Sequence, residues 1–141
     1  MKYVKAMVLM ALMTVPLWAA SRLGTYTSVV AQVPFDFVVG GKLIPAGQCI
    51  LQPATAANET ISIRNTDAKV SLFSPTSTAE TRIAADSSAL VFHKYGDRYF
   101  LSAIRLEGTR TVYEVPQSRA EAELNGQKAP SVETVTVSSL R

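Results

Sequence analysis

The side chains best suited to catalysis gather around the chain's one histidine, His93, which stands among aromatic residues in the stretch ALVFHKYGDRYFLSAIRL. As a general base, His93 would need a carboxylate to orient it and a nucleophile within hydrogen-bond reach. The sequence contains no G-x-S-x-G elbow to mark such a nucleophile. His93 is therefore a catalytic candidate without identified partners, and its neighbours Tyr95, Tyr99 and Phe100 are candidate binding residues.

Cys49 is the one cysteine, so no disulfide can form within the chain. It is either a small buried residue in a strand or a thiol that forms an intermolecular disulfide, which would make the protein a homodimer. One histidine and one cysteine cannot supply the nitrogen and sulfur ligands of a usual zinc site, and the chain lacks an acidic calcium loop. We predict no metal and no cofactor.

The N-terminus has the pattern of an export signal. Basic MKYVK precedes an apolar run at residues 6–20, too short for a spanning helix of about twenty residues. We predict a signal-peptide helix in residues 1–31, with cleavage after Ala31 favoured over cleavage after Ala20, and no stable membrane span after cleavage. The protein is then periplasmic or extracellular.

Cleavage after Ala31 would leave the chain formally neutral. The basic residues fall from 14 to 11, because Lys2, Lys5 and Arg22 are lost, and 11 acidic residues remain. A neutral chain lacks the basic face that binds phosphates, so the sequence argues against a nucleic-acid partner.

The remaining residues 32–141 carry strand patterns. Apolar residues alternate from Val33 to Val39, and short alternating runs follow (QCILQ, TISIR, KVSLF, TRTVYEV and SVETVTVSS), separated by turn-rich segments. SRAEAELNG is the one predicted helix, with the capping box Ser118-x-x-Glu121 at its start and Asn125-Gly126 at its end. About seven to eight short strands without alternating helices predict a single all-β domain, an antiparallel sandwich or a small barrel.

The stretch around His93 reads as a hairpin with Gly96-Asp97 in its turn. The predicted cross-strand pairs are Tyr95–Arg98, Lys94–Tyr99, His93–Phe100 and Phe92–Leu101. One face should then collect Leu90, Phe92, Leu101 and Ala103, and the other Val91, His93, Tyr95, Phe100 and Ile104. In this interpretation His93 is a half-buried partner of Phe100 rather than a catalytic base.

VPFDFVVGGKLIPAGQCIL, LVFHKYGDRYFLSAI and the helix after EVP together resemble a group of small exported bacterial β-proteins. That group shares the patterns F-x-F-x-x-G, L-P-A-G and F-x-x-Y-G-x-x-Y-F-L. Cys49 stands where the pattern usually has an aromatic residue. The group has no established activity, so the resemblance implies export and a β-fold and transfers no catalytic residue.

Three functions remain open at this stage. The first is a non-enzymatic binding or structural role in the cell envelope, with an unknown envelope protein or small ligand as partner. The second is a carrier that holds an apolar ligand inside a β-barrel. The third is a hydrolase that uses His93, which requires a nucleophile or carboxylate beside the ring.

Overall fold

The computed structural model describes residues 28–55, 57 and 59–140, which form twelve strands and one short helix. The strands are β1 (Ser28–Val33), β2 (Phe37–Val39), β3 (Lys42–Ile44), β4 (Gly47–Pro53), β5 (Thr60–Asn65), β6 (Val70–Pro75), β7 (Ser77–Glu80), β8 (Ala89–Tyr95), β9 (Arg98–Arg105), β10 (Thr111–Glu114), β11 (Ser131–Thr136) and β12 (Ser138–Leu140). The helix is α1 (Arg119–Gln127). This helix, the one among the described residues, is not long and apolar enough to cross a membrane.

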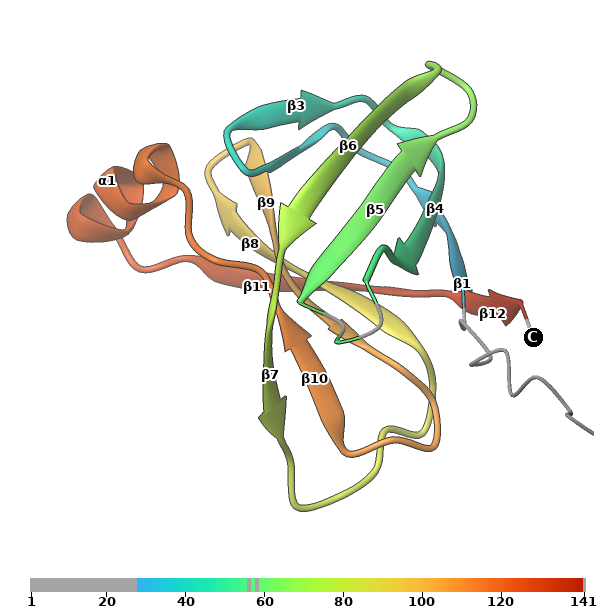
Figure 1. Cartoon of the computed structure of the whole chain (residues 1–141). Helices are drawn as coiled ribbons and strands as arrows, with labels where there is room; N and C mark the ends of the chain where they lie inside the picture. Colours follow the sequence, from blue (N-terminus) through green and yellow to red (C-terminus); the bar gives the residue numbers. More distant parts are fainter. Residues whose placement is uncertain (1–27, 56, 58, 141) are drawn as a thin grey trace, which may run out of the picture.

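The strands form two sheets in a sandwich-like arrangement without a closed barrel, which confirms the all-β prediction (Figure 1). Sheet A has the order β12-β1-β4-β5-β6. Sheet B has the order β11-β8-β9-β10-β7, and β2 joins it by a parallel pairing with β9 and carries β3 on its other side.

The strand count exceeds the expected seven or eight, in part because extended runs divide where the chain changes sheets and in part because β3 forms a short hairpin with β2. Only Thr76 separates β6 of sheet A from β7 of sheet B, and only Val137 separates β11 of sheet B from β12 of sheet A. A strand that bends from one sheet into the other makes a corner of a sandwich. These two crossings tie the sheets together along opposite sides.

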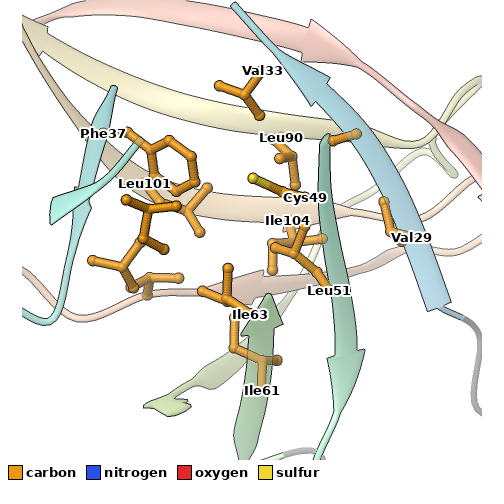
Figure 2. Close-up of a cluster of buried hydrophobic side chains, with 14 of the residues drawn as sticks. Val29, Val33, Phe37, Cys49, Leu51, Ile61, Ile63, Leu90, Leu101 and Ile104 are labelled. Atoms are coloured by element: carbon orange, nitrogen blue, oxygen red, sulfur yellow. The ribbon is translucent and has the colours of Figure 1, made fainter. Parts of the chain in front are cut away.

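The core lies between the inner faces of the two sheets, and Figure 2 shows part of it. Apolar side chains from both sheets are almost fully buried there, among them Val33, Phe37, Leu51, Ile63, Leu90, Phe92, Leu101 and Ile104. The hollow that opens at one end of the core measures about 20 Å³ and is lined by Val29, Ile61, Ile104 and Tyr113 among others. It has room for about one water, so this opening does not favour an interior carrier.

Strand β1 bears on the two predicted signal-cleavage sites. The predicted signal-peptide helix lies outside the described residues, but residues 28–31 belong to β1. Val29 and Ala31 are buried and pair with Leu51 and Cys49 of β4. Cleavage after Ala31 would remove most of this core strand, whereas cleavage after Ala20 leaves it whole.

The β8–β9 hairpin has the predicted register from Tyr95–Arg98 to Phe92–Leu101. Beyond Phe92 the register shifts, so that Val91 pairs with Ala103 and Leu90 with Ile104. Ser102 is the extra residue of this β-bulge. The predicted faces of Ala103 and Ile104 are therefore wrong, because a one-residue shift exchanges the two faces of a strand. Ile104 joins the inner core, and Ala103 packs with Val91 on the outer face of sheet B, which points away from sheet A.

Helix α1 begins as predicted and ends later than predicted. Ser118 is the N-cap, and its hydroxyl accepts a hydrogen bond from the backbone N–H of Glu121. The helix continues through Asn125 and Gly126 to Gln127, where the N–H of Lys128 donates to the carbonyl of Leu124.

Candidate functional site

A polar cluster on the outer face of sheet B surrounds the His93 ring. Glu121 Oε1 lies 2.9 Å from Nδ1 of His93, and Ser102 Oγ lies 3.1 Å from Nε2. The hydroxyl of Tyr95 donates to the same Glu121 oxygen over 3.3 Å. We call His93, Tyr95, Ser102 and Glu121 the His93 cluster.

Each element contributes for a structural reason. His93 and Tyr95 are two residues apart on β8, so both side chains point to the same face. Ser102 is the extra residue of the β-bulge in β9, and its hydroxyl lies against the His93 ring. Glu121 belongs to α1. In a capping box its carboxylate would accept from the backbone N–H at the helix N-terminus. Here the carboxylate instead contacts His93 and Tyr95 of the sheet.

The cluster is sheltered but open to solvent at His93. The Glu121 side chain is 4 % exposed, whereas the His93 side chain is 28 % exposed. Burial, the negative charge of Glu121 and the hydrogen bond to it together raise the pKa of Tyr95, and a hydrogen bond from Gln117 opposes them. Tyr95 therefore keeps its proton and acts as a donor to Glu121.

For a neutral imidazole, the partners of the two ring nitrogens define one arrangement of protons. An ionised carboxylate only accepts hydrogen bonds, so the Nδ1–H of His93 donates to Glu121. In the neutral imidazole, Nε2 then accepts from the hydroxyl of Ser102. This is the tautomer that a histidine base uses when an acid orients it and a serine stands at its other nitrogen.

The other predicted binding residues divide between the two faces of the hairpin. Phe100 pairs with His93 and is 1 % exposed, with its ring edge-on to that of Tyr95. Tyr99 points to the opposite face, where its ring stacks on Phe35 with 3.7 Å between the centroids. The structure therefore joins Tyr95 to the His93 cluster, places Phe100 beside it as packing, and separates Tyr99 from it.

Ser102 and Glu121 were absent from the sequence candidates. Glu121 was visible as a capping residue, but its contact with His93 spans 28 residues of chain, and local pattern does not predict such pairs. Ser102 carries no motif. It is the extra residue of a β-bulge, and no glycine or proline in β9 marks that bulge in the sequence.

Cys49 lies in β4 and is fully buried in the core (Figure 2). This agrees with the interpretation of Cys49 as a small buried residue in a strand. Burial, with a smaller effect of the Asp67 charge, raises the pKa of the thiol to about 11. A disulfide to a second chain would need the sandwich to open at this position. No group of three or more histidine, cysteine, aspartate or glutamate side chains that could hold a metal ion occurs in the described part of the chain.

A groove of about 500 Å³ lies on the same outer face, between the connection from β7 to β8 and the strands β8 to β11. We call it the threonine–arginine groove. Its lining contains five threonines and two arginines, with Asp86 as the one acidic residue: Thr81, Arg82, Ile83, Ala84, Ala85, Asp86, Ser87, Ala89, Arg105, Thr109, Thr111, Val112, Thr134 and Thr136.

The register places this groove next to the His93 cluster. Thr134, which lines the groove, pairs with Val91, and two residues further along these strands Val132 pairs with His93. Two residues of a strand span about 7 Å. The groove and the cluster therefore occupy consecutive rows of one sheet face.

Comparison of the chain with protein-family models, curated proteins and solved structures finds no match.

Proposed function

We propose that this chain is an exported β-sandwich domain that binds a carboxylate-bearing polymer of the bacterial cell envelope in the threonine–arginine groove. Export rests on the signal pattern of residues 1–31 and on the resemblance to small exported β-proteins. Cleavage after Ala20 is the site compatible with an intact β1. The binding role rests on the composition of the groove, which is the observation that carries the proposal.

The groove is hollow because its floor consists of small side chains on the sheet, such as Ala89, Thr111 and Thr136. Threonine hydroxyls donate and accept hydrogen bonds without a net charge. The hydroxyls of Thr81 and Thr109 already donate to backbone carbonyls of the protein. A polar chain rich in hydroxyl and amide groups can bond to those of Thr111, Thr134 and Thr136, which an apolar ligand cannot do.

The charge of the groove selects the sign of the ligand. The lining contains two arginines, Arg82 and Arg105, and one acidic residue, Asp86, so the positive charges outnumber the negative ones. Guanidinium groups bind carboxylates by two parallel hydrogen bonds. Peptidoglycan combines sugar hydroxyls, amides and the carboxylates of its stem peptides, and it therefore has the chemistry that this lining would recognise.

The test is cosedimentation of the mature protein, purified from an exporting host, with isolated peptidoglycan sacculi. We expect binding that weakens as salt rises, because the arginine contacts are solvent-accessible and screened. The double variant Arg82→Ala/Arg105→Ala should lose most of this binding.

The matched control removes the same charge elsewhere. Lys42 and Arg64 are exposed and do not line the groove, so Lys42→Ala/Arg64→Ala should sediment like the parent protein. If both double variants lose the same amount of binding to sacculi, the net charge of the protein explains the binding and a groove site is refuted. Cosedimentation with anionic lipid vesicles but not with sacculi would refute the choice of ligand.

A further inference from the structure

We propose that the His93 cluster hydrolyses small carboxylic esters, with Ser102 as nucleophile, His93 as general base and Glu121 as positioning residue. This activity goes beyond the binding function and does not depend on it, because a small ester needs no contact with the groove. The proposal stands on the two hydrogen bonds that join Ser102 Oγ, the His93 ring and the Glu121 carboxylate.

The roles follow from which nitrogen meets which partner. In an acid–histidine–serine arrangement the acid holds Nδ1–H, and Nε2 faces the hydroxyl that it must deprotonate. Glu121 Oε1 is 2.9 Å from Nδ1 and Ser102 Oγ is 3.1 Å from Nε2. Both distances lie in the range expected for a base and its partners.

The reaction balances with water as the only co-reactant. Ser102 Oγ attacks the ester carbonyl carbon while its proton passes to Nε2 of His93. The tetrahedral intermediate then breaks the bond to the leaving alkoxide, which takes that proton and departs as the alcohol. A water molecule, deprotonated by Nε2, attacks the acyl-serine, and the proton returns to Ser102 as the carboxylic acid leaves.

The surroundings of Ser102 limit the substrate. Ser102 is half-buried, and its carbonyl accepts a hydrogen bond from the N–H of Val115, so the chain leading to α1 lies close to it. Because this segment lies close to Ser102, the test uses a short acyl group, acetyl. We assign no donor to the developing oxyanion, and a single such donor is worth about 10²–10³ in rate, so turnover should be slow and restricted to activated esters.

Two measurements on the full mature protein test the nucleophile. The first is hydrolysis of p-nitrophenyl acetate. The second is covalent labelling by a fluorophosphonate, with the modified residue located by peptide mass spectrometry. We expect slow hydrolysis above the buffer rate and a label on Ser102. Ser102→Ala should lose both, and Ser71→Ala, on an exposed position of sheet A, should keep both.

The role of Glu121 is tested with Glu121→Gln, whose amide oxygen can still accept from His93 and Tyr95. If Glu121 orients the base electrostatically, hydrolysis falls by about 10²-fold or more, while the far-UV circular dichroism spectrum is unchanged.

Two outcomes overturn the proposal. One is hydrolysis that survives in Ser102→Ala at the parental rate, since general surface basicity would then explain it. The other is failure of the folded parent to hydrolyse p-nitrophenyl acetate or to take the label. Neither outcome touches cosedimentation with sacculi, so the two functions fail separately.

Discussion

Removing the carboxylate of Glu121 should destabilise the domain far more than removing that of Glu123, the other acidic residue of α1. Glu121 is 3 % exposed and accepts hydrogen bonds from His93 and Tyr95. A hydrogen bond to a charged group contributes about 1.5–3 kcal/mol. Glu121→Ala loses two of them and leaves the Tyr95 hydroxyl without this partner, but it also removes the cost of burying a charge.

We expect a net loss of about 3 kcal/mol in the free energy of unfolding, which for a domain of this size lowers Tm by roughly 10 °C. The matched control is Glu123→Ala on the same helix. The Glu123 side chain is 69 % exposed, and its ion pair with Arg119 is exposed as well, so this change should stay within about 0.5 kcal/mol. Urea unfolding followed by circular dichroism measures both.

The loss should concentrate in the helix, because α1 has nine residues and helices this short are marginal in water without tertiary contacts. In Glu121→Ala we expect faster amide hydrogen exchange at the Lys128 N–H, which bonds to Leu124, while the strands of sheet A keep their protection. If Glu121→Ala and Glu123→Ala unfold at the same urea concentration, the cluster does not hold the helix and the reasoning fails.

The same contact has a pH signature through Tyr95. Its pKa is raised in the folded state by burial first and then by the charge and hydrogen bond of Glu121. Protonated Tyr95 therefore stabilises the fold fully below the unfolded-state pKa of about 10, and this contribution is lost as pH rises through the higher folded-state value. Tyr95→Phe should unfold less steeply with rising alkaline pH than the parent does.

Three further predictions concern the rest of the fold. Gly47→Ala should cost about 2–4 kcal/mol, because Gly47 has a φ of +140° and an added Cβ would lie 2.6 Å from Asp67 Oδ2; Gly126→Ala, which meets no atom within 4 Å inside the helix, should be neutral or stabilising in the same melt. Cys49 should resist the thiol reagent DTNB in the native protein and react only on unfolding, because it is buried with a raised pKa; rapid labelling or a reducible dimer would contradict this. N-terminal sequencing of the exported protein should find a start before Ser28, since a later start would cut into β1.

The parts of the fold that the sequence predicted are those set by local pattern. The turn at Gly96-Asp97, where Gly96 has a φ of +61°, fixed the register of the hairpin as far as Phe92. Alternation located most of the strands, although the run from Val33 to Val39 divides between β1 and β2 and the short strand β3 was not predicted. The capping box located the start of α1 at Ser118. Each of these depends on residues within a few positions of one another, which is why the pattern sufficed.

The parts that escaped prediction depend on distant contacts. SVETVTVSS reads as one strand, but it divides at Val137 because its first part pairs with β8 and its end pairs with β1. Nothing within nine residues specifies that change of partner. The burial of Val29 and Ala31 likewise depends on pairing with β4. The sequence pattern did not contain that pairing, and it therefore favoured cleavage after Ala31, within the strand.

The bulge at Ser102 shows what local pattern could not predict about the His93 cluster. In a regular hairpin that pairs His93 with Phe100, Ser102 would pair with Val91 and would be a diagonal neighbour of His93 on the same face. The shift gives the place opposite Val91 to Ala103, and the hydroxyl of the extra residue, Ser102, lies 3.1 Å from Nε2 of His93. Bulges re-aim single side chains, and no glycine or proline in β9 marks this one. Alternation can place Ser102 and His93 on one face of the hairpin, but the hydrogen bond between them depends on the local backbone geometry, and the contact with Glu121 of α1 depends on packing between segments distant in the sequence.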